Sequence, residues 1–296
     1  MTWLARDDHD AKLVAIKVRN PEHHSTLSLE EDSERLLPRD LMNSVLNIGT
    51  SSSSVPTVRA RAPRDHFLAA DPDGLHSCLV YEPAGLSVYT VLSDTGRRLR
   101  ADLARKVARQ TAETLADMHR RGWVHGDLTT GNILFRLDPQ VQDWSDRDIF
   151  AYFGDPYVYG PPERQFVDCI DTYKLLDSYF LQEDIILADF KHSFKVRRPL
   201  PPGHPLCTLT HYMSPELRFD GRIGMPSDIW ALACVIFEVR TGSPLFDECS
   251  GEEGAWKSVV RILGEPPEAW KGPEDWSLRS TNVPMGSSCM RSARRI

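Results

Sequence analysis

The segment from Leu99 to Leu134 restricts the possible folds more than any other part of the chain. Within it, residues of one helical face recur every three or four positions: Leu99, Leu103, Val107, Thr111, Leu115 and Met118. This spacing predicts an amphipathic helix of about twenty residues, which Gly122 is well suited to end. A polar loop follows, and Asn132 to Phe135 has the composition of a buried strand. A long helix, a polar loop and a short strand therefore follow one another directly.

Composition and length set broad limits on the chain. Its 296 residues are 41% apolar and 26% charged, which is ordinary for a globular protein and long enough for two domains or one domain of two lobes. The longest apolar run, Ile229 to Phe237, is far shorter than the ~20 residues of a membrane span. The N-terminus becomes acidic within its first seven or eight residues, at Asp7 and Asp8, and has no apolar h-region. We therefore expect no membrane association and no secretory signal.

Charge and cysteine usage narrow the partners and the compartment. Lys and Arg number 35 against 42 Asp and Glu, a formal net charge of −7, so we expect no direct nucleic-acid binding and a basic partner. Six cysteines are scattered without a C-x-x-C pair. This pattern predicts free thiols in a reducing compartment, the cytoplasm or nucleus.

Further elements divide the chain near Pro83. The β-branched run Lys12 to Val18 and the segment Ser77 to Tyr81 predict strands, and a helix is predicted from Leu27 to Leu37, stopped by Pro38. After the central helix, Ser227 to Thr241 predicts an apolar helix with Ser-Asp as its N-cap. We expect an N-lobe at 1–85, a C-lobe at 86–276 with an irregular insertion at 136–183, and a basic disordered tail at 277–296.

Asp127 and Asn132 lie five residues apart in the polar loop. Phosphoryl transfer requires a carboxylate that orients the attacking hydroxyl and takes its proton, and an oxygen ligand for the magnesium ion on the phosphates. Asp127 suits the first role and Asn132 the second. Both residue types are also common in turns, so the pair alone leaves a purely structural role open.

Three further motifs favour phosphoryl transfer. Lys17 ends the run Val-Ala-Ile-Lys on a predicted strand, where an ammonium group can pair with phosphate oxygens. Asp189 follows the strand Ile-Leu-Ala and would supply a second magnesium ligand. Glu216, in Ser-Pro-Glu, precedes Asp228, in Ser-Asp-Ile-Trp, farther along the chain. The motifs are far more specific in this order than each is alone.

In this order and spacing the motifs resemble those of the eukaryotic protein kinases, from about Trp3 to Trp270. Within that family the chain resembles the SR-protein kinase-like group common in fungi, and the long insertion between Asn132 and Asp189 is similar to that group too. The closer resemblance lies in four segments: Trp3 to Asp7, Cys78 to Pro83, His125 to Asn132, and Ser227 to Leu245. It implies an α+β, bilobal fold with a small β-rich N-lobe and a larger helical C-lobe.

The resemblance implies ATP and Mg²⁺ as cofactors and assigns the phosphate-binding residues. Lys17 would anchor the phosphates, Asp127 would be the catalytic base, and Asn132 and Asp189 would hold magnesium. A helix glutamate should pair with the lysine, and Glu30, Glu31 and Glu34 are all available. We favour Glu34, which shares a helical face with Leu37 and Leu41.

The same resemblance assigns an adenine pocket and two scaffold residues. Tyr81 would line the back of the pocket, while the Glu82 carbonyl and the Ala84 N–H would face adenine. Glu216 would be a structural acid, and Asp228 would brace the catalytic loop.

Several positions depart from the family pattern. No glycine precedes Gly49, so we expect the Gly-rich loop and the first strand to be absent. The chain stops about where the last C-lobe helices of the family should begin, so we expect both ends of the fold to be truncated. Thr129 replaces a lysine, and Lys191 replaces the glycine after Asp-Phe. Gly126 replaces the arginine that senses a phosphorylated activation loop, so we do not expect activation by loop phosphorylation.

Three functions follow from the resemblance and these departures. The first is an ATP-dependent serine/threonine kinase acting as a monomer on protein substrates, including Arg/Ser-rich ones. The alternative is a catalytically weak or inactive pseudokinase that serves as a scaffold. The third is a small-molecule kinase of the aminoglycoside or choline type, which also uses His-Gly-Asp-x-x-x-x-Asn. The segments around Glu216 and Asp228 argue against this third function, because the resemblance makes them a platform for peptide substrates.

Overall fold

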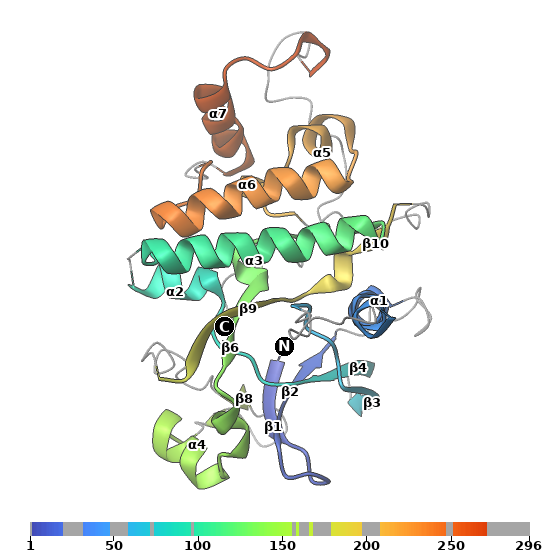
Figure 1. The fold of residues 1–296 in the computed structure, drawn as a ribbon, viewed down its shortest axis with the longest axis vertical. Coiled ribbons are helices and arrows are strands. Elements are labelled where there is room, and N and C mark those ends of the chain that lie inside the picture. The colour runs from blue at the N-terminus through green and yellow to red at the C-terminus, as the bar shows by residue number, and fades with distance from the viewer. Residues whose placement is uncertain are drawn as a thin grey trace.

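The computed structural model describes residues 2–19, 32–47, 59–71, 74–95, 98–155, 158–159, 166–167, 179–196, 208–246 and 251–270. In this part of the chain an antiparallel sheet lies toward one end of the molecule, and most of the helices lie toward the other (Figure 1). This is the predicted α+β bilobal arrangement. The predicted tail, 277–296, lies outside the described residues.

The smaller lobe is built on a four-stranded sheet. Its spatial order is β1-β2-β4-β3, formed by β1 (Thr2–Arg6), β2 (Leu13–Val18), β3 (Asp65–Asp71) and β4 (Gly74–Tyr81). The β-branched strand β2 is central and pairs Lys17 with Leu79 of β4. Strand β3 is mostly exposed, and only His66 and Ala69 are half-buried. Its sequence therefore lacks the alternation of apolar and polar residues that would predict a strand. A hairpin closed by the bond from the Gly74 N–H to the Asp71 carboxylate holds it against β4.

Helix α1 (Ser33–Asn47) continues past the proline that was expected to stop it. Pro38 lies inside the helix and removes one backbone hydrogen bond, at a cost of about 3 kcal/mol. On either side of it Leu37 and Leu41 are buried in the core, and burying each side chain is worth about 2 kcal/mol. Tertiary packing therefore outweighs the local penalty. Residues 27–31 of the predicted helix lie outside the described residues.

The larger lobe is helical. Its described helices are α2 (Val88–Thr95), α3 (Ala101–Arg120), α5 (Pro215–Asp220), α6 (Met225–Thr241) and α7 (Gly251–Leu263). Helices α3 and α6 lie side by side (Figure 1). Val107 and Leu115 of α3 and Val235 of α6 belong to the same buried hydrophobic core. Helix α6 starts two residues earlier than expected. Its N-cap is Gly224, and Ser227 lies in the first turn with its hydroxyl accepting from the Gly224 N–H at 3.3 Å.

The composition of the insertion at 136–183 predicts an irregular segment, but its described part contains a helix and two short strands. Helix α4 (Asp146–Phe153) begins at a capping box of Ser145 and Asp148. Short strands β7 (Val158–Tyr159) and β8 (Phe166–Val167) pair with each other. Trp144, which follows a short 3₁₀ turn, contacts Phe180 edge to face. Local capping therefore gives this acidic, aromatic segment regular structure that hydrophobic periodicity does not reveal.

Four short strands of the larger lobe hold the loops that matter for function. Strand β6 (Ile133–Leu137) pairs with β9 (Leu181–Leu187), and β5 (Trp123–Val124) pairs with β10 (Phe194–Lys195). Residues 82–87 connect β4 to α2 and thus join the two lobes. Within the described part of the chain, no helix is long and apolar enough to cross a membrane.

Candidate active site

Lys17 lies between two carboxylates, one from each lobe. Its Nζ is 2.7 Å from Glu34 Oε1 on α1 and 2.8 Å from Asp189 Oδ1 after β9. Burial alone would lower the pKa of Lys17, but the two carboxylates raise it well above its usual value. The ammonium group is therefore charged at any physiological pH. Glu30 and Glu31, the other two candidates for this pairing, lie outside the described residues.

Arg19 also contacts Glu34, and sequence reasoning missed it. Its guanidinium bonds to Asp32 at 2.9 and 3.2 Å and to the second oxygen of Glu34. Asp32 in turn accepts the Glu34 N–H at 3.0 Å, which caps the start of α1. A signal was present in the sequence: Lys17 and Arg19 are two residues apart at a strand end, so their side chains point to the same side.

Asp127 and Asn132 contact each other within the polar loop between β5 and β6. The Asn132 side-chain amide donates to the Asp127 carbonyl at 2.7 Å and to its carboxylate at 3.2 Å. The β6–β9 register brings this loop to Asp189, because Ile133 pairs with Leu187 and the Ala188 N–H donates to the Asn132 carbonyl at 2.9 Å. The loop and Asp189 therefore lie at the same end of one strand pair.

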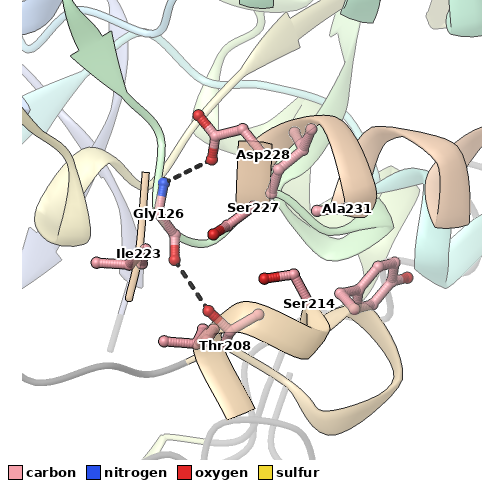
Figure 2. A pocket seen from close by; sticks show the side chains of 10 residues that line it. Gly126, Thr208, Ser214, Ile223, Ser227, Asp228 and Ala231 are labelled. Carbon is pink, nitrogen blue, oxygen red and sulfur yellow. Dashed lines mark hydrogen bonds between the residues drawn. The ribbon is translucent and has the colours of Figure 1, made fainter. Parts of the chain in front are cut away.

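Asp228 bonds to the backbone of the loop that precedes Asp127. Its carboxylate accepts from the backbone N–H groups of His125 and Gly126 at 2.8 and 3.0 Å, and lies 2.9 Å from His119 Nε2. Figure 2 shows Gly126 between Asp228 and Thr208, at the edge of a small pocket. Glu216 accepts from the Ser227 hydroxyl at 3.1 Å. Both acids therefore make contacts within the scaffold of the larger lobe.

Asp189 has an unusual backbone and two cationic neighbours. Its φ of 62° is in the left-handed region, which only short polar residues and glycine visit readily. Lys191, the residue in the family's glycine position, places its Nζ 3.5 Å from Asp189 Oδ2. Burial opposes ionisation, yet Lys17 and Lys191 hold the pKa of the Asp189 carboxyl well below its usual range. The carboxylate is thus ionised but shared between two lysines.

The segment that joins the lobes carries the predicted adenine contacts. The buried Tyr81 lies with its hydroxyl 3.4 Å from Glu34 Oε1. Ala84 follows in the connection, and the next residue, Gly85, packs so tightly that a Cβ would lie 2.3 Å from Leu181. The Glu82 carbonyl accepts from Arg61 Nη2 at 3.1 Å. Sequence reasoning did not single out Arg61, since a lone arginine in a basic loop carries no signal.

The oxygen atoms at this site suit magnesium. Asp189 offers a carboxylate, and Asn132 offers a carboxamide oxygen because its NH₂ group is used on Asp127. No cluster of three or more His, Cys, Asp or Glu that could hold a metal occurs among the described residues. Mg²⁺ does not need one, since it usually combines one or two carboxylates with substrate phosphates and water.

Sequence comparisons point to protein kinases. A family model described as lipopolysaccharide kinase (Kdo/WaaP) matches residues 75–145. Protein kinase dsk1 of Schizosaccharomyces pombe is 22% identical, over 90% of this chain and 64% of dsk1. The probable serine/threonine-protein kinase clkA of Dictyostelium discoideum is 28% identical over 98% of this chain and 29% of clkA. Dual specificity protein kinase CLK1 of Homo sapiens is 27% identical over 65% and 34%.

The chain thus spans less than two thirds of the length of each of these relatives. Among solved structures, the kinase domain of PF14_0431 matches with a TM-score of 0.52 and 18% identity, over 83% of this chain and 61% of that one. At this identity the match shows a shared fold. The chain therefore has the bilobal protein kinase fold and is similar in sequence to serine/threonine and dual specificity protein kinases.

Proposed function

We propose that this chain is a protein serine/threonine kinase that transfers the γ-phosphoryl group of ATP to serine or threonine hydroxyls, including those of Arg/Ser-rich proteins. The observation that supports this most is the convergence of the phosphate-binding residues. Lys17 lies 2.7 Å from Glu34 and 2.8 Å from Asp189, at the strand end where Asn132 bonds to Asp127. Such an arrangement suits a substrate whose charge is on phosphate groups.

Each residue has a distinct role in the proposed reaction. The Asp127 carboxylate orients the substrate hydroxyl and takes its proton as the oxygen bonds to the γ-phosphorus and the bond to the β-phosphate oxygen breaks. Lys17 holds the α- and β-phosphate oxygens, and Glu34 keeps the lysine in place. Asn132 and Asp189 would ligate Mg²⁺, which neutralises charge on the phosphates when bound.

Two finer proposals concern substrate and location. The net charge of −7 favours basic peptides, in keeping with Arg/Ser-rich substrates. Cys78 and Cys234 are buried free thiols, which is consistent with a reducing compartment; the other four cysteines lie outside the described residues. We propose that the chain acts as a monomer in the cytoplasm or nucleus.

A pseudokinase scaffold is the second candidate, and a specific observation favours it. Asp189 is engaged by Lys17 through one oxygen and faces Lys191 with the other, so a magnesium ion must compete with two cations. The small-molecule kinase alternative has less support. The lipopolysaccharide kinase match ends at residue 145, before the α5 and α6 segments.

A radiolabelled ATP assay distinguishes the two candidates. Wild-type chain and Asp127→Ala are compared on an Arg/Ser-repeat peptide and on a neutral serine peptide. Loss of the base should reduce phosphate incorporation by about 10²–10⁴-fold. The Arg/Ser peptide should incorporate more phosphate than the neutral one. Equal incorporation by wild type and Asp127→Ala would contradict the kinase proposal, and equal use of the two peptides would contradict the substrate class.

A further inference from the structure

The backbone of Arg61 and its neighbours is bonded to strand β9 of the larger lobe. Its N–H donates to the Leu187 carbonyl at 2.7 Å, and the Leu187 N–H donates to the Arg59 carbonyl at 2.7 Å. Residues 59–61 therefore run beside β9, next to the strand end that carries Asp189. The Arg61 side chain therefore starts close to the proposed nucleotide site.

The guanidinium group of Arg61 reaches the connecting segment. Its Nη2 donates to the Glu82 carbonyl at 3.1 Å, and its Cζ lies 4.6 Å from the centre of the Tyr81 ring. Within the described part of the chain, its Nε is buried and has no hydrogen-bond partner. Burial lowers the pKa of Arg61, but a guanidinium remains charged in proteins. The group is a permanent cation that can only donate hydrogen bonds.

Such a group changes the chemistry that a nucleobase meets. In the proposed function the Glu82 carbonyl accepts from the 6-amino group of adenine. Here Arg61 already donates to that carbonyl, and its own N–H groups would face the amino hydrogens, donor against donor. A purine with a 6-oxo group presents an acceptor instead, which arginine recognises well. Leaving buried donors without acceptors is unfavourable, so the two classes of base should differ in affinity.

We propose that Arg61 is a specificity-determining residue of the nucleotide site, which disfavours a 6-amino purine and accepts a 6-oxo purine. Guanosine and inosine triphosphates should then bind at least as tightly as ATP. This inference rests on the proposed function, since it assumes that the nucleotide base lies against residues 82–84.

Equilibrium binding of ATP, GTP and ITP tests the inference directly. ITP is the sharpest probe, because its base differs from adenine at the 6 position and lacks the 2-amino group of guanine. Calorimetric titrations with MgCl₂ are made on the full chain and on Arg61→Met, which keeps similar length and packing over Tyr81 without the charge. We expect Arg61→Met to shift the ratio of ITP to ATP affinity by at least tenfold toward ATP.

Arg59→Met is the matched control. Arg59 lies two residues away and bonds to Glu113 at 3.2 Å, so its loss should leave the affinity ratio unchanged. Thermal melting verifies that the variants are folded, and Arg61→Leu provides a second apolar replacement if Arg61→Met does not fold. A wild-type preference for ATP that is the same in Arg61→Met or Arg61→Leu would overturn the inference.

The binding measurements distinguish a failure of this inference from a failure of the proposed function. Nucleotide binding with an unchanged ratio contradicts only the role of Arg61. Binding with the expected shift in ratio supports that role, even if no phosphate is transferred to peptide. No binding of any of the three nucleotides, by wild type or either variant, overturns both.

Discussion

At the scale of single residues, Gly126 occupies a position where this backbone does not accept a side chain. Its φ is 79°, and a Cβ built there would lie 2.6 Å from the His192 carbonyl oxygen. The left-handed conformation costs a side chain about 1–2 kcal/mol, and overpacking against backbone costs about 1–3 kcal/mol. Local packing in this backbone therefore requires a glycine at position 126.

We predict that Gly126→Ala lowers the free energy of unfolding by about 2–5 kcal/mol, the sum of these two effects. Urea denaturation measures it. Gly122→Ala is the control, because Gly122 has a similar φ of 75° but nothing within 4 Å of a Cβ, so only the conformational cost of about 1–2 kcal/mol applies. An equal loss of stability in the two variants would refute the proposed clash.

A candidate site residue is predictable from sequence where the chemistry restricts the residue type, and a contacting residue is not where the chemistry leaves the type open. Glu34 was one of three candidates, and the structure places it against Lys17. Arg19 and Arg61 contact the same region but were missed, since arginine is common on surfaces and its long side chain hides which neighbour it reaches. The spacing of residues in the sequence therefore does not predict which residue a long, flexible side chain contacts across the fold.

At the scale of elements, the ion pairs of Arg19 join strand β2 to helix α1. Asp32 and Glu34 both contact its guanidinium, and both carboxylates are nearly buried. Removal of Arg19 would leave two carboxylates short of partners at the helix start, where Glu34 would keep only its contacts with Lys17 and the Tyr81 hydroxyl. The position of α1 relative to the sheet therefore depends on this arginine as well as on Lys17.

We predict that Arg19→Met lowers the free energy of unfolding by about 1–3 kcal/mol and raises the KM for ATP, because Glu34 no longer holds Lys17 firmly. Denaturant titration and steady-state kinetics measure the two effects. Arg120→Met is the control: Arg120 makes an exposed ion pair with Asp117, so its loss should change stability by no more than about 0.5 kcal/mol. If both variants behave alike, Arg19 has no special role.

Elements were predictable in proportion to how far local sequence decides them. Strand β2 and helix α3 follow from β-branched composition and from an apolar stripe, and both occur where expected. Strand β3 depends on its partner β4, and α4 depends on one capping box, so neither has a periodic signal. Pro38 was misjudged because the packing of α1 is a property of the whole core.

At the scale of the whole molecule, His125 couples the stability of the fold to pH. It is fully buried in the loop that leads to Asp127, and burial lowers its pKa below the usual 6.5. Below that pH the unfolded chain takes up a proton that the folded His125 does not. Its contribution is therefore complete above about pH 6.5 and is lost as the pH falls toward the folded pKa.

We predict that the free energy of unfolding decreases more steeply between pH 7.5 and 5 in wild type than in His125→Gln, which cannot titrate. Urea denaturation across this range measures the difference in slope. Glu238, whose pKa burial raises, contributes in the opposite sense: its stabilisation is lost as the pH rises through its folded pKa. Because both chains contain Glu238, its contribution cancels in the comparison. Parallel pH profiles would contradict the role of His125.

The contact of Arg6 with the insertion has a consequence for motion between the lobes. Arg6 ends β1 and bonds to the Trp144 carbonyl at 2.7 Å and to Asp146 at 2.7 and 2.9 Å. Other bonds join the same two lobes elsewhere, from Lys17 to Asp189 and between residues 59–61 and Leu187. Because Arg6 pairs with Leu13 and Lys17 pairs with Thr2, Arg6 and Lys17 lie at opposite ends of the β1–β2 pair. Twisting of one lobe across the other would therefore have to break bonds at both ends of this strand pair.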